Sequence, residues 1–130
     1  MVCTFRKGNY ISLSPPYKID TVVTVCSDIF HIEKRRYVLV SPHDTNTLNS
    51  IESELAKKLS ADVRLFDDNN AVLLKLPYRY NKYEIQWKGL ANSLSFTKGN
   101  TLHIGISLVG LLVADEVMTP CFKCESVAII

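Results

Sequence analysis

A long alternation of apolar and polar residues near the C-terminus limits the possible folds of this chain more than any other pattern. Residues 101–113 carry apolar side chains at every second position over much of their length: Leu102, Ile104, Ile106 and Leu108. Because successive side chains of a β-strand point to opposite faces of the sheet, this pattern predicts a strand with one buried face. Residues 117–129 form a second strand-like stretch, and Asp115 and Glu116 between the two predict a tight turn.

Shorter segments of the same kind fill much of the remaining chain. They are rich in β-branched and apolar residues and are bounded by turn-forming residues. They lie near residues 3–13 and at residues 19–26, 37–40, 62–66, 71–76 and 83–87. Residues 67–70 predict a hairpin turn, whereas Pro15 and Pro16 are expected to interrupt the chain. Gly105 and Gly110 predict bends, bulges or the close approach of another backbone.

One segment has helical periodicity. Its apolar residues recur every three or four positions, on one face of a helix: Leu48, Ile51, Leu55 and Leu59. We therefore expect a single helix at residues 46–59. Asp44, Thr45 or Thr47 can accept hydrogen bonds from its first free amides.

The order of these elements predicts a mostly β protein of about six to eight strands with one helix. A chain of 130 residues fits one domain, so residues 1–130 are expected to form a small, curved β-barrel whose open end the helix covers. With 47% hydrophobic and 22% charged residues, the composition is that of a folded globular protein. Residues 109–114, the longest apolar stretch, are too few to span a bilayer, and the N-terminus does not resemble a secretory signal. We expect an intracellular protein, cytoplasmic or nuclear, that is not secreted and has no membrane partner.

Basic residues concentrate in two separate blocks, although the net charge is only +2. Residues 1–40 carry six basic and three acidic side chains, and residues 72–100 carry five and one. The other segments are acidic overall. A fold that brings the two blocks together would present one basic face, which would attract a polyanion.

The second basic block also concentrates aromatic rings. Residues 75–88 hold three Tyr, the only Trp and four basic residues. Single-stranded nucleic acid exposes base faces that stack on aromatic rings and phosphates that attract cations, so this segment has the chemistry to bind both. The candidate binding residues are Lys75, Tyr78, Arg79, Tyr80, Lys82, Trp87 and Lys88. In the ordinary alternative, Tyr83 and Trp87 face inward from a strand and the cations only solvate a loop.

A second candidate group lies between two strand-like stretches and precedes the helix. It consists of three consecutive cations beside an aromatic ring: Lys34, Arg35, Arg36 and Tyr37. At a hairpin tip these cations can hold phosphates. The alternative is a charged tip that keeps the protein soluble.

With the N-terminal stretch counted as a strand, residues 1–76 have the order strand, strand, strand, helix, strand, strand. This order resembles the oligonucleotide-binding barrel, or OB-fold, in which a helix lies between the third and fourth strands. Residues 75–88 also resemble the surface that small single-stranded-DNA-binding proteins of DNA viruses and mobile elements present to DNA. The resemblance implies an OB-like barrel that binds single-stranded DNA. The further strands after residue 80 depart from a minimal OB-fold and leave an unrelated β-barrel or a sandwich open.

The cysteine and histidine residues form no common metal-binding or catalytic motif. Cys121 and Cys124 have the spacing of half a zinc site, but Cys3 and Cys26 do not supply the other half. We therefore expect free thiols, no metal and no cofactor. The three histidines are scattered, and the common hydrolase, nucleotide-binding and metalloprotease motifs are absent. The sequence predicts a protein without enzymatic activity.

These patterns together predict a protein that binds single-stranded nucleic acid, most simply DNA, with low sequence specificity. The alternative is a structural or protein-interaction β domain, a subunit of a viral or cellular assembly. In that case the same Tyr, Trp and Arg residues would form a protein interface. Free strand edges and the apolar end of the chain, residues 127–130, would then support a homo-oligomer.

Overall fold

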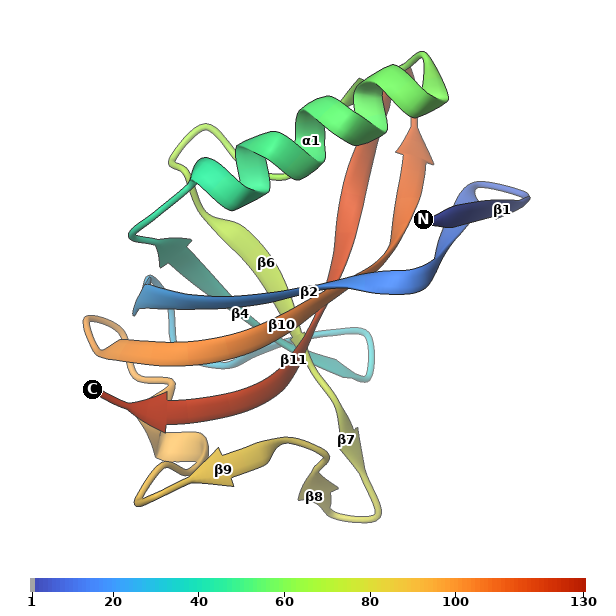
Figure 1. Ribbon diagram of the computed structural model, residues 1–130. Coiled ribbons are helices and arrows are strands. Elements are labelled where there is room, and N and C mark those ends of the chain that lie inside the picture. The colour runs from blue at the N-terminus through green and yellow to red at the C-terminus, as the bar shows by residue number, and fades with distance from the viewer. Residues whose placement is uncertain (1) are drawn as a thin grey trace.

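A computed structural model describes residues 2–130, and most of them lie in β-strands (Figure 1). In chain order the elements are β1 (Cys3–Lys7), β2 (Tyr10–Val25), β3 (Phe30–Ile32), β4 (Arg35–Pro42), α1 (Asn46–Leu59), β5 (Asp62–Val63), β6 (Val72–Leu76), β7 (Tyr78–Arg79), β8 (Lys82–Tyr83), β9 (Gln86–Lys88), the 3-10 helix η1 (Ser93–Ser95), β10 (Thr101–Ala114) and β11 (Val117–Ile129). The predicted class, a mostly β protein with one α-helix, is confirmed. Across residues 2–130 there is no helix with the length and apolar character that crossing a membrane requires.

Five strands form a closed ring of hydrogen-bonded neighbours. In spatial order they are β2, β10, β11, β6 and β4, and the pairing of β4 with β2 closes the ring. Four of these pairings are antiparallel, whereas β11 runs parallel to β6. The sheet continues through β1 beside β2 and β3 beside β4, and β5 and β9 pair with β11. β7 and β8 form a separate two-stranded hairpin.

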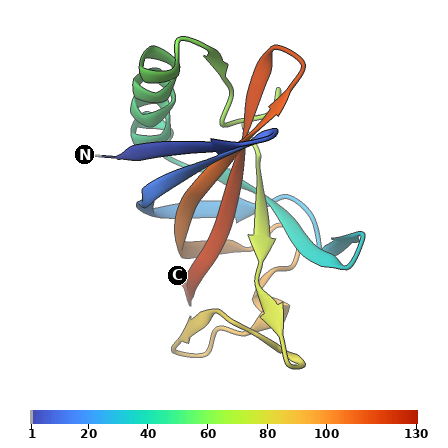
Figure 2. The same ribbon diagram turned by 90° about the vertical axis from the view of Figure 1, so that its right-hand side faces the viewer.

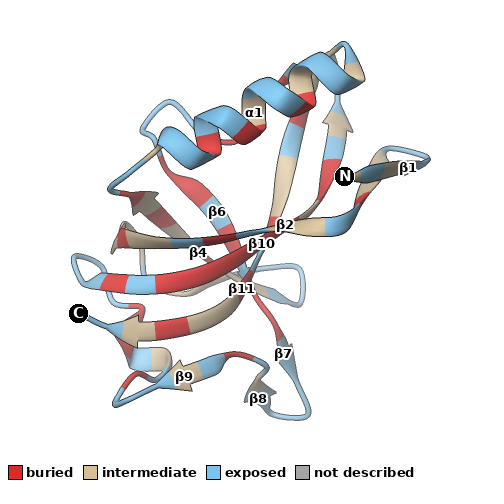
Figure 3. Ribbon diagram, in the orientation of Figure 1, coloured by how far each residue is buried: buried red, intermediate tan, exposed pale blue. Residues whose placement is uncertain are grey.

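Much of the apolar core is made of residues that alternate along the ring strands (Figure 3). The buried face predicted for β10 is confirmed, since Leu102, Ile104, Ile106 and Leu108 are at most 1% exposed. The neighbouring ring strands contribute further buried side chains: Val23, Val38, Val40, Leu74, Leu76 and Val127. Each such aliphatic side chain stabilises the fold by about 1.5–3 kcal/mol relative to exposure. The opposite faces of β4, β6 and β11 remain available for a binding site.

The two glycines of β10 lie where another chain segment crosses closely. A Cβ atom on Gly110 would stand 2.7 Å from the carbonyl oxygen of Ile11 and would overlap the ring of Tyr10. A Cβ atom on Gly105 would stand 2.5 Å from Ser126 Oγ. The pairing of β10 with β11 also shifts register beside both glycines. These findings confirm the predicted bulges and close approach.

Helix α1 lies at one end of the molecule and spans the predicted residues 46–59 (Figures 1 and 2). Its buried face consists of Leu48, Ile51 and Leu55. Asp44 Oδ1 accepts a hydrogen bond of 2.9 Å from the amide of Asn46, and Glu52 Oε2 accepts one of 2.8 Å from the amide of Leu65. In both views the segment from β7 to β9 lies at the opposite end of the molecule.

Two expectations about the N-terminal region are wrong. The stretch near residues 3–13 is not one strand, because Gly8, with φ of 62°, turns β1 back to pair with β2. Pro15 and Pro16 do not interrupt the chain but lie within β2. The pairing of β2 with β10 skips these residues, so neither proline is required to donate an amide hydrogen bond.

Two other local expectations also differ from the structure. Residues 83–87 are not one strand, since Tyr83 pairs with Tyr78 in the β7–β8 hairpin whereas Trp87 lies in β9 beside β11. Residues 67–70 do form a turn, but β5 and β6 on either side of it both pair with β11 in parallel rather than with each other. Parallel pairing joins segments that are distant in the chain, so the local pattern does not reveal it.

Candidate nucleic-acid interface

The first candidate group lies at the hairpin formed by β3 and β4. Glu33 occupies the turn with φ of 58°, and the chain then enters β4. Lys34 and Arg35 are exposed at this tip, whereas Arg36 and Tyr37 are half-buried. The hairpin therefore places two cations in solvent and directs the next two side chains toward neighbouring elements.

The second candidate group follows β6 and ends at another hairpin. Pro77 follows the last residue of β6, and the chain then forms β7 and β8 around Tyr80 and Asn81. These two turn residues have φ values of 53° and 61°, which is typical of a two-residue hairpin turn. The Tyr80 side chain is 84% exposed, and Arg79 Cζ lies 5.3 Å from its ring centroid.

The two candidate groups meet around one open hollow of about 430 Å³. It is lined by Lys34, Arg35, Arg36, Lys75, Leu76, Pro77, Tyr78, Arg79, Glu84 and Lys123. Six of these side chains are cationic and one is a carboxylate. We refer to this surface as the basic hollow. The two basic blocks of the sequence therefore contribute to a single face.

No cation of the basic hollow forms an ion pair with a residue that the structure describes. Within residues 2–130 the ion pairs join Lys18 to Glu125 and Arg64 to Asp62, outside this hollow. Like charges that line one concave surface raise the local concentration of anions. The basic hollow therefore has the electrostatics of a site for a polyanion.

Arg36 is held in place by two tyrosine rings. Its Cζ lies 3.4 Å from the ring centroid of Tyr78, and its Nη1 donates a hydrogen bond of 3.2 Å to Tyr83 Oη. The hydrogen bond to Tyr83 raises the pKa of the Arg36 guanidinium. The two tyrosine rings meet edge to face at 5.0 Å. Arg36 thus covers one face of Tyr78 and adds a planar cation on which a base can stack.

Five predicted binding residues lie outside the basic hollow: Tyr37, Tyr80, Lys82, Trp87 and Lys88. Tyr80 and Lys82 belong to the β7–β8 hairpin, which extends from the end of β6 (Figure 1). They adjoin Arg79, which does line the hollow.

Trp87 and Lys88 are placed differently from each other. The Trp87 ring is half-buried and contacts Tyr83 and Phe96 edge to face, at centroid distances of 6.0 and 6.1 Å. This packing corresponds to the ordinary alternative, in which the ring stabilises the fold. Lys88 lines a small hollow on another part of the surface beside His103.

The register of the sheet adds one basic residue that sequence reasoning missed. Tyr37 lies opposite Lys75 across β4 and β6, and Lys75 lies beside Lys123 across the parallel pair β6 and β11. Phe122 and Cys124 on either side of Lys123 are apolar and buried. Because side chains alternate between the two faces of a strand, Lys123 faces outward, and the sequence pattern alone indicates this. Its position beside Lys75 depends on the parallel pairing, which the sequence does not indicate.

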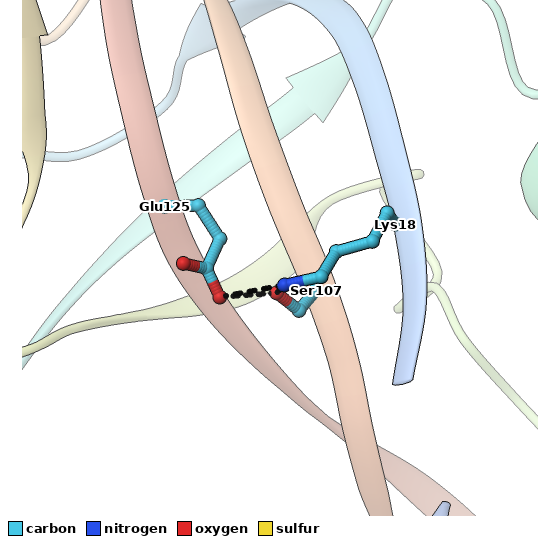
Figure 4. Close-up of polar contacts among 3 residues, drawn as sticks. All are labelled: Lys18, Ser107 and Glu125. Carbon is cyan, nitrogen blue, oxygen red and sulfur yellow. Dashed lines mark hydrogen bonds and ion pairs between the residues drawn. The ribbon is translucent and has the colours of Figure 1, made fainter. Parts of the chain in front are cut away.

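The row formed by Lys75 and Lys123 ends at a polar network on the neighbouring strands β10 and β2 (Figure 4). Lys123 lies opposite Ser107, and Ser107 lies opposite Lys18. Lys18 Nζ lies 3.2 Å from Ser107 Oγ and 3.3 Å from Glu125 Oε1, and Ser107 donates a hydrogen bond to the same carboxylate. The hydrogen bond from Ser107 is the main cause that lowers the pKa of Glu125, and Lys18 adds to it. Because Glu125 pairs with Lys18, that lysine does not extend the basic face.

The Cys121 and Cys124 pair is divided between two environments along β11. Cys124 is fully buried, and burial raises the pKa of its thiol to about 12. Cys121 is half-buried on the outer side, where burial also raises the thiol pKa. All four cysteines are free. Among residues 2–130, no three His, Cys, Asp or Glu side chains gather in an arrangement that could hold a metal ion.

No protein-family model, no curated protein and no solved structure matches this chain. The basic hollow and its neighbouring rings are the features from which we argue the function.

Proposed function

We propose that this protein binds single-stranded nucleic acid, most simply single-stranded DNA, with low sequence specificity. The observation that carries the proposal is the basic hollow, where cations from residues 34–36 and 75–79 converge beside the ring of Tyr78. Phosphates of a flexible strand would contact the cations, and exposed bases would stack on Tyr78 and Tyr80. Neither kind of contact reads the edge of a base, so little sequence preference is expected.

The strand order supports an OB-like barrel as the scaffold of this site. β2, β4 and β6 are successive neighbours in the ring, β10 returns to lie beside β2, and β11 closes the ring. The first four follow the Greek-key order. The OB-fold is a five-stranded Greek-key barrel that binds oligonucleotides over its second and third strands and the loop between its first two. β4 and β6 hold the second and third places here, and they carry Arg35 and Lys75. The position of α1 departs from that family, because it precedes the third ring strand.

The proposal is tested by fluorescence anisotropy with a labelled thymine strand and a duplex of the same length. A strand of about 20 nucleotides exceeds the roughly 4–16 that one OB-fold covers. We expect binding that prefers the single strand and weakens with salt. Lys75→Gln should weaken binding several-fold, whereas Lys57→Gln on the exposed side of α1 removes the same charge without effect. No binding in low salt with tens of micromolar protein would refute the proposal.

A structural or protein-interaction role is the second candidate, and exposed apolar residues favour it. Leu90 and Ile130 follow the paired strands β9 and β11 and are 89% and 68% exposed. Phe5 on β1 is 69% exposed, and within residues 2–130 this strand pairs with β2 alone, so one edge is open to a second copy. Size-exclusion chromatography over a dilution series separates the two roles. Assembly without nucleic acid would favour a homo-oligomer through this edge or the apolar C-terminus, and a monomer that shifts only with oligonucleotide would favour the first role.

A further inference from the structure

A second hollow lies beside the basic hollow and shares three of its residues. Its volume is about 330 Å³, within the range of roughly 300–1,000 Å³ for small-molecule sites. The shared residues are Arg35, Lys75 and Lys123. The other walls are apolar and aromatic side chains from β2, β4, β6, β10 and β11. We refer to it as the apolar hollow.

Tyr10 forms one wall of the apolar hollow because Gly110 leaves room for its ring. A Cβ atom at residue 110 would overlap that ring. The Tyr10 hydroxyl donates a hydrogen bond of 3.4 Å to the carbonyl of Val109, which also lines the hollow. Burial raises the pKa of the Tyr10 phenol, so this wall stays neutral. Tyr37, which is half-buried on β4, supplies a second ring.

The chemistry of the lining defines the kind of ligand that the apolar hollow takes. Leu73 and Leu112 are 38% and 45% exposed, so hydrophobic surface faces solvent there. The charged side chains of the hollow are Arg35, Lys75 and Lys123, all of them cations. A complementary ligand therefore combines a flat, apolar body with negative charge on one side. A nucleotide within a single strand has this combination.

We propose that the apolar hollow receives one unstacked nucleobase of a bound single strand, while the adjoining phosphates contact the three shared cations. This inference rests on the proposed function and adds a base-binding pocket to it. The register places Tyr37, Lys75 and Lys123 in one row on three adjacent strands. A ring and two cations are thereby held at fixed positions by the sheet rather than by a loop. The bound nucleic acid would then run across this face of the sheet as well as along the hairpin that carries Tyr80.

Photocrosslinking locates the bound base. A thymine strand with 5-iodouracil in place of thymine is bound to the protein and irradiated, and the crosslinked residues are identified by mass spectrometry. We expect crosslinks at Tyr37 or Tyr10. Salt-sensitive binding with crosslinks confined to Tyr78 and Tyr80 would overturn the inference and leave the proposed function in place. A protein that binds no strand at all would overturn both.

An abasic strand of the same length separates contacts to bases from contacts to phosphates. Tyr37→Ala and Leu112→Ala each remove part of the wall of the apolar hollow without removing charge. Each should weaken binding of the thymine strand about fivefold or more. Binding of the abasic strand should not change. Leu94→Ala is the matched control, since Leu94 is exposed outside the hollow. Leu112 is partly exposed, so its variant keeps the test valid if Tyr37→Ala does not fold. Equal effects on both strands, or no effect on either, would assign the hollow to another ligand, such as an acidic peptide, and overturn the inference.

Discussion

Gly110 leaves no room for a side chain, because backbone and ring atoms occupy the space that its Cβ atom would take. Gly110→Ala would force the backbone of Ile11 and the ring of Tyr10 to move, and overpacking of this kind costs about 1–3 kcal/mol. Gly105→Ala should cost less, since it meets the hydroxyl of Ser126, which can rotate. Urea denaturation of the two variants measures the difference. A less stable Gly105→Ala would contradict this ranking.

Glu125 makes the stability of the fold depend on pH. Its pKa is lowered in the folded state, mainly by the hydrogen bond from Ser107, so the contribution is present at neutral pH. It is lost as pH falls below about 4.5 through the lowered folded pKa. Glu125 is partly exposed, so the loss is modest. Ser107→Ala should show a smaller decrease in urea midpoint between neutral and acidic pH than the parent protein. An unchanged pH dependence would remove Ser107 as the cause.

At the level of elements, a local sequence pattern predicts a strand or helix correctly where burial of one face is enough to define it. The alternation along residues 101–113 and the helical spacing at residues 46–59 both follow from burial of one face, and both elements form where expected. The strand expected at residues 83–87 fails because Tyr83 and Trp87 pair with different neighbours. Apolar alternation indicates which face is buried but not which strand lies beside it.

Helix α1 should affect stability without affecting binding, because it lies at the opposite end of the molecule from the β7–β8 hairpin (Figure 2). Leu55 is fully buried on this helix, so Leu55→Ala should reduce the free energy of unfolding by about 2–5 kcal/mol. The exposed neighbour Lys57 provides a control, since Lys57→Ala should change stability by no more than about 0.5 kcal/mol. Chemical denaturation and anisotropy of the folded variant measure the two properties. Weaker strand binding by folded Leu55→Ala would place part of the site at the helix.

At the level of the complete fold, strand pairing brings together the residues of the proposed site, which the sequence only suggested. The sequence locates two basic blocks, but the antiparallel pairing of β4 with β6 is what brings Tyr37 opposite Lys75. The parallel pairing of β6 with β11 then adds Lys123, which lies in a segment that is acidic overall. Trp87, in contrast, does not line the basic hollow. Its ring packs against Phe96, which lies outside residues 75–88. Long-range pairing, rather than composition, therefore determines which of the candidate residues share a surface.

This shared surface predicts how binding of a single strand depends on salt. Each phosphate contact made by a cation contributes about 0.7 to the slope of log K against log salt concentration for a single strand. Arg79→Gln removes a cation of the basic hollow and should reduce the slope by about this amount. Lys18→Gln should change it much less, because Glu125 already neutralises Lys18 on the neighbouring face. Anisotropy titrations of both variants over a series of salt concentrations measure the slopes. Equal slopes for the two variants would mean that cations of the basic hollow contribute no more to nucleic-acid binding than cations elsewhere on the sheet. The proposed site would then be wrong.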